Sequence, residues 1–152
     1  QMSLAEKINI DVKNALKAGD KKLLAVSRNV LSELKNLLIR ENLPRDISGV
    51  SDDSFQKVIK IIVKQKKETK EYLVQVNDQE KIDIINYDLL YLESFMPKYL
   101  SDKETEDLIK KYISENNFEK KDFGKLMGLL KSNQGNEIDL SKAAKFANSL
   151  LN

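Results

Sequence analysis

Apolar residues recur every three or four positions along almost the whole chain, and this spacing is the strongest constraint on its fold. The first such segment places Leu4, Ile8, Val12 and Leu16 on one face of a helix. No segment shows the sustained alternation of apolar and polar residues that a half-buried strand would require. We therefore predict an all-α, multihelical protein without a sheet.

Capping and helix-breaking residues mark the ends of seven predicted helices. Ser3 and Glu6 have the spacing of a capping box, and Gly19 suits the left-handed end of the first helix. Pro44 disfavours helix just before it, so the second helix should end near Glu41. A loop at 42–51 separates the second helix from a third at about 53–76, and a fourth helix ends before Pro97. The fifth helix follows the capping box at 101–104, and the sixth covers 121–131. A polar loop at 132–136 precedes the last helix, which Asp139 or Ser141 caps.

Pro97 also separates two parts of the chain. It ends the fourth helix and begins a short connector at 97–100. We therefore expect an N-terminal four-helix subdomain at 2–96 and a C-terminal three-helix subdomain at 101–152, which together form one unit.

The predicted fourth helix carries apolar residues on two sides. One stripe runs from Ile82 to Met96, and a second stripe with Tyr87, Tyr91 and Phe95 lies roughly opposite. An amphipathic surface helix needs only one stripe. The helix is therefore either buried between neighbours or presents one face to a protein partner, and the sequence leaves both interpretations open.

The chain lacks the residues that catalysis most often uses. It has no Cys and no His, which removes thiolate nucleophiles, the most common general base and the most common zinc ligands. The segment around Lys125 superficially resembles a phosphate-binding loop, but Glu119 and Leu126 stand where that loop needs Gly and Ser or Thr. Acidic pairs such as the aspartates at 52–53 lie at helix starts, where their charge interacts favourably with the helix dipole, so they need no catalytic role. We therefore predict no catalytic residue, no metal site and no cofactor.

Charge and hydropathy narrow the class of protein further. The 26 basic residues nearly balance the 24 acidic ones, unlike the strongly basic composition of a dedicated nucleic-acid clamp. The longest apolar runs have four residues, whereas a membrane-spanning helix needs roughly 20, and the N-terminus has no apolar signal region. We expect a cytoplasmic protein without membrane contact, or one of an organellar matrix if a targeting segment has been removed.

The predicted third helix carries a row of lysines. Lys57, Lys60, Lys64 and Lys67 fall within about 80° of one another, opposite the apolar side. Such a row could follow the phosphates of a nucleic acid. Alternatively, it is a solvated face with local ion pairs to glutamates four residues later, as most charge runs are. Lys66 lies instead on the apolar side, where we expect its ammonium to extend towards solvent.

A second candidate binding segment lies at 120–128. Gly124 and Gly128 have the spacing that lets two helices approach closely, which we expect within the C-terminal subdomain. Alternatively, Gly124 with Lys121 and Lys125 would let the backbone approach a ribose or a phosphate. Between residues 101 and 152, nine basic residues face nine acidic ones, so this part of the chain is not basic overall.

Three stretches of the sequence carry a family resemblance. They are RNVLSEL at 28–34, after an amphipathic first helix, LESFMPKYLS at 92–101 and DFGKLMG at 122–128. Together, and in this order, they resemble the GatB/YqeY family, specifically its small standalone YqeY-like members. The chain departs from the family pattern at Asn136 and Leu140, where the family often has a basic residue and a glycine.

The resemblance implies four N-terminal and three C-terminal helices, and a relation to the tail domain of the tRNA amidotransferase B subunit, a domain that contacts tRNA. Similar domains are appended to some glutaminyl-tRNA synthetases. We therefore expect a non-catalytic, tRNA-associated module that assists glutamine-dependent tRNA amidation or aminoacylation, with tRNA, an amidotransferase or an aminoacyl-tRNA synthetase as partners. The related enzyme is a carbon–nitrogen ligase with glutamine as amido-N-donor, but the chain shows no signature of its amidase nucleophile or its ATP-dependent activation site.

Two sets of residues follow from the two functional hypotheses. The nucleic-acid-binding residues would be Lys57, Lys60, Lys64, Lys67, Lys121, Gly124 and Lys125. The alternative is a protein–protein adaptor, whose contact face would be Tyr87, Tyr91 and Phe95.

Overall fold

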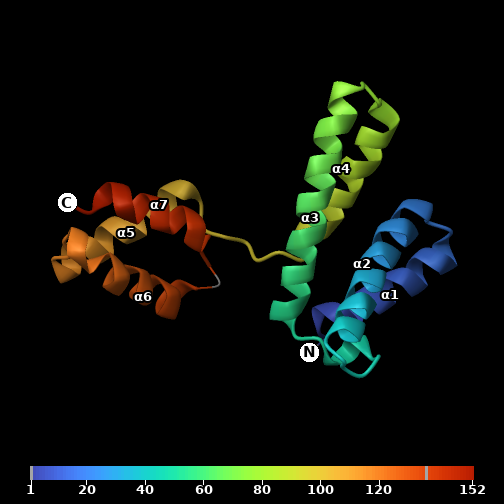
Figure 1. Ribbon diagram of the computed structural model, residues 1–152, viewed down its shortest axis with the longest axis horizontal. Helices are drawn as coiled ribbons and strands as arrows, with labels where there is room; N and C mark the ends of the chain where they lie inside the picture. The colour runs from blue at the N-terminus through green and yellow to red at the C-terminus, as the bar shows by residue number, and fades with distance from the viewer. Residues whose placement is uncertain (1, 136) are drawn as a thin grey trace. The chain divides into compact units, whose positions relative to one another are not determined.

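The computed structural model describes residues 2–135 and 137–152, and these residues form seven α-helices and two short 3-10 helices (Figure 1). Their order is α1 (Leu4–Ala18), α2 (Lys21–Arg40), η1 (Ile47–Gly49), α3 (Asp52–Gln75), α4 (Gln79–Glu93), α5 (Asp102–Asn116), η2 (Lys120–Asp122), α6 (Phe123–Gln134) and α7 (Leu140–Leu150). The described residues contain no strand, which confirms the predicted all-α, multihelical fold. Asn136, one of the departures from the family pattern, lies outside the described residues.

Most helices begin and end where the capping residues predict. Ser3 Oγ accepts a hydrogen bond from the Glu6 amide at 3.1 Å, although the return bond of a full capping box is absent. Gly19 ends α1 in the left-handed region with φ of 67°. Ser101 and Glu104 form the complete reciprocal box at the start of α5. Local side-chain chemistry therefore determines these boundaries.

The sixth helix is longer than the sequence predicts. α6 runs to Gln134, so the first part of the predicted polar loop at 132–136 is helical. The reason is a contact from α5: the Tyr112 hydroxyl donates to Gln134 Oε1 and accepts from Asn133 Nδ2, each at 3.0 Å. This long-range contact satisfies the polar end of α6 and overrides its loop-like composition.

The chain divides between Met96 and Pro97 into two compact units. The first unit consists of two helical hairpins, α1 with α2 and α3 with α4 (Figure 1). The Leu4 amide donates to Asp52 Oδ1 at 3.0 Å, so the starts of α1 and α3 lie together. Its main core is Ala5, Ile8, Val26, Val30, Leu34, Leu38, Ile47, Val50, Phe55, Val58, Ile59, Ile62, Leu92 and Phe95. A smaller cluster of Leu73, Ile82, Ile85 and Leu89 holds the outer part of the α3–α4 hairpin.

The second unit contains α5, η2, α6 and α7. Its helices pack around Ile109, Leu126, Leu130, Ile138, Ala143, Ala147 and Leu151. Asp139 caps α7, because its side chain accepts from the Ser141 and Lys142 amides. The Leu100 amide donates to the Glu137 carbonyl at 2.7 Å, which attaches the end of the 97–100 segment to this unit.

Candidate nucleic-acid interface

The lysine row lies on the solvent side of α3. Ser51 caps this helix, and the opposite side of α3 buries Phe55, Ile59 and Ile62 in the core. Because these apolar residues fix the rotation of the helix, the lysines must point away from the core. The row consists of Lys57, Lys60, Lys64 and Lys67, all exposed. At a rise of about 1.5 Å per residue, it extends about 15 Å along the helix.

Only one lysine of the row has an acidic partner. Lys57 Nζ lies 3.3 Å from Asp53 Oδ2. Within residues 2–135 and 137–152, no ion pair joins Lys60, Lys64 or Lys67 to a carboxylate, so the expected local pairs to glutamates four residues later are not formed. We call these three residues the uncompensated lysines of α3. Their ammonium groups thus lie more than 4 Å from every carboxylate oxygen of the described residues and are exposed to solvent.

Lys66 does not extend to solvent as expected. Its Nζ lies 3.1 Å from Asp88 Oδ2 of α4, and the two side chains are only 22% and 10% exposed. The expectation failed because Asp88 stands on the buried side of α4, which the apolar pattern of that helix did not reveal. Lys66 is thus a structural link within the α3–α4 hairpin and not part of the lysine row.

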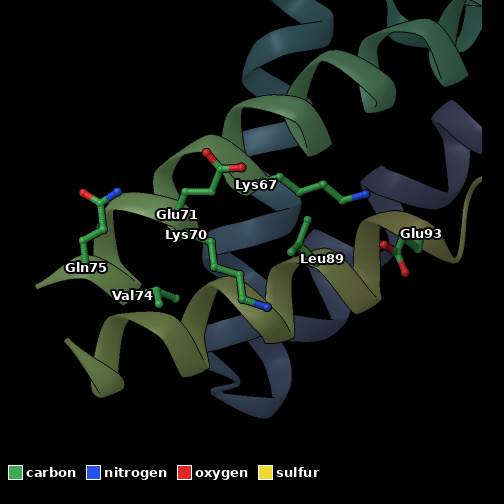
Figure 2. A pocket seen from close by; sticks show the side chains of 7 residues that line it. All are labelled: Lys67, Lys70, Glu71, Val74, Gln75, Leu89 and Glu93. Carbon is green, nitrogen blue, oxygen red and sulfur yellow. The ribbon is translucent and has the colours of Figure 1, made fainter. Parts of the chain in front are cut away.

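A groove lies beside the row, between α3 and α4 (Figure 2). It has a volume of about 750 Å³ and is lined by Lys67, Lys70, Glu71, Val74, Gln75, Leu89 and Glu93. In Figure 2, Lys67 and Lys70 stand on either side of Leu89, and Lys70 extends from α3 towards α4. Lys67 therefore belongs both to the row and to the wall of this α3–α4 groove.

The second predicted set lies in the other unit, and its lysines are paired. Lys121 Nζ is 3.6 Å from Glu119, and Lys125 Nζ is 4.0 Å from Asp122. Both lysine side chains remain 78% exposed. Gly124, between them at the start of α6, is also exposed. The three residues are thus close together, but the neighbouring carboxylates offset their positive charge.

The close helix contact expected from Gly124 and Gly128 is not present. A Cβ built at either position would meet nothing within 4 Å. Both glycines lie on the exposed side of α6, because Leu126 and Leu130 occupy its buried side. The expectation was wrong because glycine spacing alone does not say which side of a helix faces its neighbours.

The three aromatic residues of the alternative partner face pack within the first unit. Phe95 is 3% exposed, and its ring centroid lies 5.2 Å from that of Phe55 and 5.1 Å from that of Tyr91. Tyr91 and Tyr87 are partly buried, and Lys22 Nζ lies 5.7 Å from the centre of the Tyr87 ring. These contacts give the rings a role in packing α4 between its neighbours.

The Tyr91 hydroxyl joins α4 to α1. It donates to Asp11 Oδ2 at 2.6 Å, and Lys7 Nζ lies 3.9 Å from the same oxygen. Burial and the neighbouring Asp11 carboxylate raise the pKa of the Tyr91 phenol above its usual value of 10.0. The phenol is therefore a neutral hydrogen-bond donor near neutral pH and is not poised as a base or nucleophile.

A second exposed basic row lies on α2. Lys21, Arg28 and Lys35 are all exposed and stand seven residues apart, so each points within about 20° of the next. None of the three belongs to an ion pair within the described residues. The sequence reasoning missed this row, although its seven-residue spacing would have revealed it.

Comparison with known proteins agrees with the motifs. A family model described as Yqey-like protein matches residues 5–151, which include all seven α-helices apart from the first residue of α1. The chain belongs to the YqeY-like family. This confirms the resemblance carried by the stretches at 28–34, 92–101 and 122–128. A search of curated proteins gives no match.

Two common functional features are absent from the described residues of this YqeY-like chain. Over the part of the chain that the structure describes, no group of three or more Asp or Glu side chains could hold a metal ion. No described helix is long and apolar enough to cross a membrane.

Proposed function

We propose that this YqeY-like protein is a non-catalytic module that binds tRNA through the lysine row of α3. The observation that carries the proposal is the set of uncompensated lysines, Lys60, Lys64 and Lys67, on one exposed side of a well-packed helix. A nucleic acid holds condensed cations along its backbone, and lysines that contact its phosphates release these cations with a gain in entropy. The helix fixes the spacing of the three lysine backbones, while their flexible side chains remain free to reach successive phosphates.

The biological role we propose is assistance to glutamine-dependent tRNA amidation or to aminoacylation. This part rests on what the resemblance to the tail domain of the tRNA amidotransferase implies, not on a contact in the structure. The protein would hold tRNA while a separate amidotransferase or aminoacyl-tRNA synthetase performs the chemistry. Purified chain with ATP, glutamine and misacylated tRNA should show no amidation, and turnover would overturn the non-catalytic part of the proposal.

Lys121, Gly124 and Lys125 form a separate proposed contact in the second unit. Their contribution should be smaller than that of α3, because Glu119 and Asp122 already lie beside the two lysines. A phosphate that binds these lysines would have to compete with the two carboxylates and would be repelled by them. We retain this segment as an auxiliary contact.

The adaptor hypothesis has less support. Its contact face would need Tyr87, Tyr91 and Phe95 to be accessible, whereas Phe95 is buried and Tyr91 bonds to Asp11. A partner could reach only the exposed edges of the two tyrosines. We therefore do not advance a second function.

The test is a gel-shift titration of tRNA at several salt concentrations. The variant Lys60→Gln/Lys64→Gln/Lys67→Gln should weaken binding and flatten the dependence of log K on log salt by about 2 to 3 units, because each lost phosphate contact removes about one unit of slope. Its folding should be unchanged, since all three side chains are exposed.

The matched control removes the same charge elsewhere. Lys110, Lys111 and Lys142 are exposed, and each is paired with a carboxylate, so Lys110→Gln/Lys111→Gln/Lys142→Gln should change binding much less. Equal losses in both variants would mean that net charge, not the α3 row, drives binding. No shift by the native protein at micromolar concentration in low salt would reject the proposed function.

A further inference from the structure

The α3–α4 groove combines three kinds of side chain that suit different parts of one ligand. Its apolar lining residues are Val74, which is 53% exposed, and Leu89, which is 8% exposed. Lys67 and Lys70 supply ammonium groups, whereas Glu71 and Glu93 supply carboxylates (Figure 2). Its volume of about 750 Å³ falls within the range of roughly 300–1,000 Å³ that is typical of small-molecule sites.

The carboxylates decide which part of a nucleic acid could enter. The lining holds two lysines and two glutamates, so the groove has no net charge with which to attract a phosphate. A nucleobase is uncharged, has an apolar face for Val74 and Leu89, and carries N–H donors that a carboxylate can accept. The groove therefore suits a base, while the outer face of α3 suits the backbone.

Lys67 connects the two surfaces. It is the last lysine of the row and also lines the groove, so a strand whose phosphates follow Lys60, Lys64 and Lys67 arrives at the groove entrance. Bases within a duplex are stacked and paired, and cannot be inserted sideways without being extruded at a cost of a few kcal/mol. Only an unpaired nucleotide can therefore use both surfaces at low cost.

We infer that the α3–α4 groove holds an unpaired nucleobase of the RNA whose backbone lies on the α3 lysines, so that the protein binds single-stranded segments in preference to duplex. This inference rests on the proposed function and makes it more specific. It separates two contributions: the lysines bind any RNA backbone, and the groove discriminates between unpaired and paired bases.

The experiment compares a short single-stranded RNA with a duplex that contains the same sequence, by fluorescence anisotropy with the full chain. Native protein should bind the single strand more tightly. Val74→Asn replaces the exposed apolar side chain of the groove without changing its charge. It should weaken single-strand binding by roughly fivefold to tenfold. Duplex binding and the salt slope should stay unchanged. Val76→Asn is the matched control, because Val76 is similarly exposed at 50% but does not line the groove.

The outcomes distinguish the inference from the proposed function. If the lysine-row variant loses binding to both RNAs but Val74→Asn behaves like native protein, the groove inference fails and the proposed function stands. Equal or tighter binding of duplex by the native protein also overturns the inference. If native protein binds neither RNA, both fail. Thermal melting checks the fold, and the isosteric Val74→Thr replaces Val74→Asn if the latter disturbs α3.

Discussion

The Lys66 ammonium of α3 lies 3.1 Å from the Asp88 carboxylate of α4, and this ion pair is mostly removed from solvent. It stands in the outer half of the α3–α4 hairpin, where the apolar cluster consists only of Leu73, Ile82, Ile85 and Leu89 with Val63 beside it. A cluster of that size provides limited hydrophobic stabilisation. The ion pair therefore helps to fix α4 against the helix that carries the uncompensated lysines.

Replacing Lys66 with methionine should destabilise the protein. The change leaves Asp88 with a buried charge and no partner within the described residues, which typically costs 3–5 kcal/mol for a fully buried pair. Because Lys66 is still 22% exposed, water can partly solvate the carboxylate, and we expect a loss of about 2 kcal/mol. Urea unfolding at neutral pH measures this difference.

The double variant Lys66→Met/Asp88→Leu provides the control. Without either charge, much of the lost stability should return, because two apolar side chains can fill the site. Lys64→Met, at an exposed position two residues away, should change stability by less than about 0.5 kcal/mol. A loss in the double variant as large as that in Lys66→Met would contradict the role of an uncompensated Asp88.

The partly buried Tyr91 hydroxyl should make the stability of the protein depend on pH in the alkaline range. Its pKa is raised in the folded protein, so the unfolded chain releases the phenol proton first once the pH exceeds about 10. Above that pH the unfolded state binds fewer protons than the folded state, and stability falls as the pH rises. The contribution of this phenol is thus present below its ordinary pKa and is lost above it.

Tyr91→Phe removes both the hydrogen bond and the titration. Near neutral pH it should cost about 1–2 kcal/mol, because Asp11 loses a donor at 2.6 Å. The stability difference from the native protein should shrink as the pH rises above 10, and guanidinium unfolding at a series of pH values measures it. Tyr99→Phe is the control, since its hydroxyl makes no hydrogen bond in the described residues. A constant difference at every pH would refute the titration argument.

The fold could be predicted from sequence because its signals are local. Ser3 and Ser101 each accept a hydrogen bond from the amide three residues later, as the cap spacing predicts. The apolar spacing of α3 fixes which side of that helix is buried, so the exposure of its lysines also followed from the sequence. Such features require no knowledge of how the helices pack.

Contacts between distant segments could not be predicted in this way. Lys66 and Asp88 are 22 residues apart, and Tyr91 and Asp11 are 80 apart. Helical periodicity gives the direction of each side chain on its own helix but not the residue that it meets on another. The same limit explains why the close helix contact predicted at Gly124 and Gly128 was wrong, and why the extension of α6 through its contact with Tyr112 was not predicted.

The candidate site was foreseen only in part. The lysine row needs only the geometry of one helix, whereas the α3–α4 groove needs the register of two. Val74 and Leu89 are 15 residues apart, and nothing in their local sequence says that they share a surface.

Asp52 should contribute more to stability than its neighbour Asp53. Asp52 accepts a hydrogen bond from the Leu4 amide at 3.0 Å and thereby joins the starts of α1 and α3. Asp52→Ala should cost about 1–2 kcal/mol, because a helix-start amide loses its acceptor. Asp53→Ala loses only the favourable helix dipole and an exposed pair to Lys57, and should cost about 0.5 kcal/mol. Equal costs in thermal melting would argue against the interhelical bond.

Lys121 and Lys125 should matter less to RNA than the uncompensated lysines of α3. Lys121→Gln/Lys125→Gln should lower the salt slope of tRNA binding by less than about 1 unit, because neighbouring carboxylates already offset both charges. The comparison is Lys60→Gln/Lys64→Gln, which removes the same number of charges. A larger effect in the second unit would move the principal interface from α3 to the start of α6.

Replacing Gly128 with alanine should increase the stability of the folded protein. Gly128 lies inside α6, where glycine costs about 0.5–1 kcal/mol relative to alanine because it is freer in the unfolded chain. A Cβ at this position meets nothing within 4 Å, so Gly128→Ala should recover most of that cost and raise the melting temperature. Gly19→Ala is the opposite case: with φ of 67°, alanine is strained there and should lower stability by about 1 kcal/mol. Thermal melting of both variants measures the two effects, and an unchanged or lower melting temperature for Gly128→Ala would contradict the prediction.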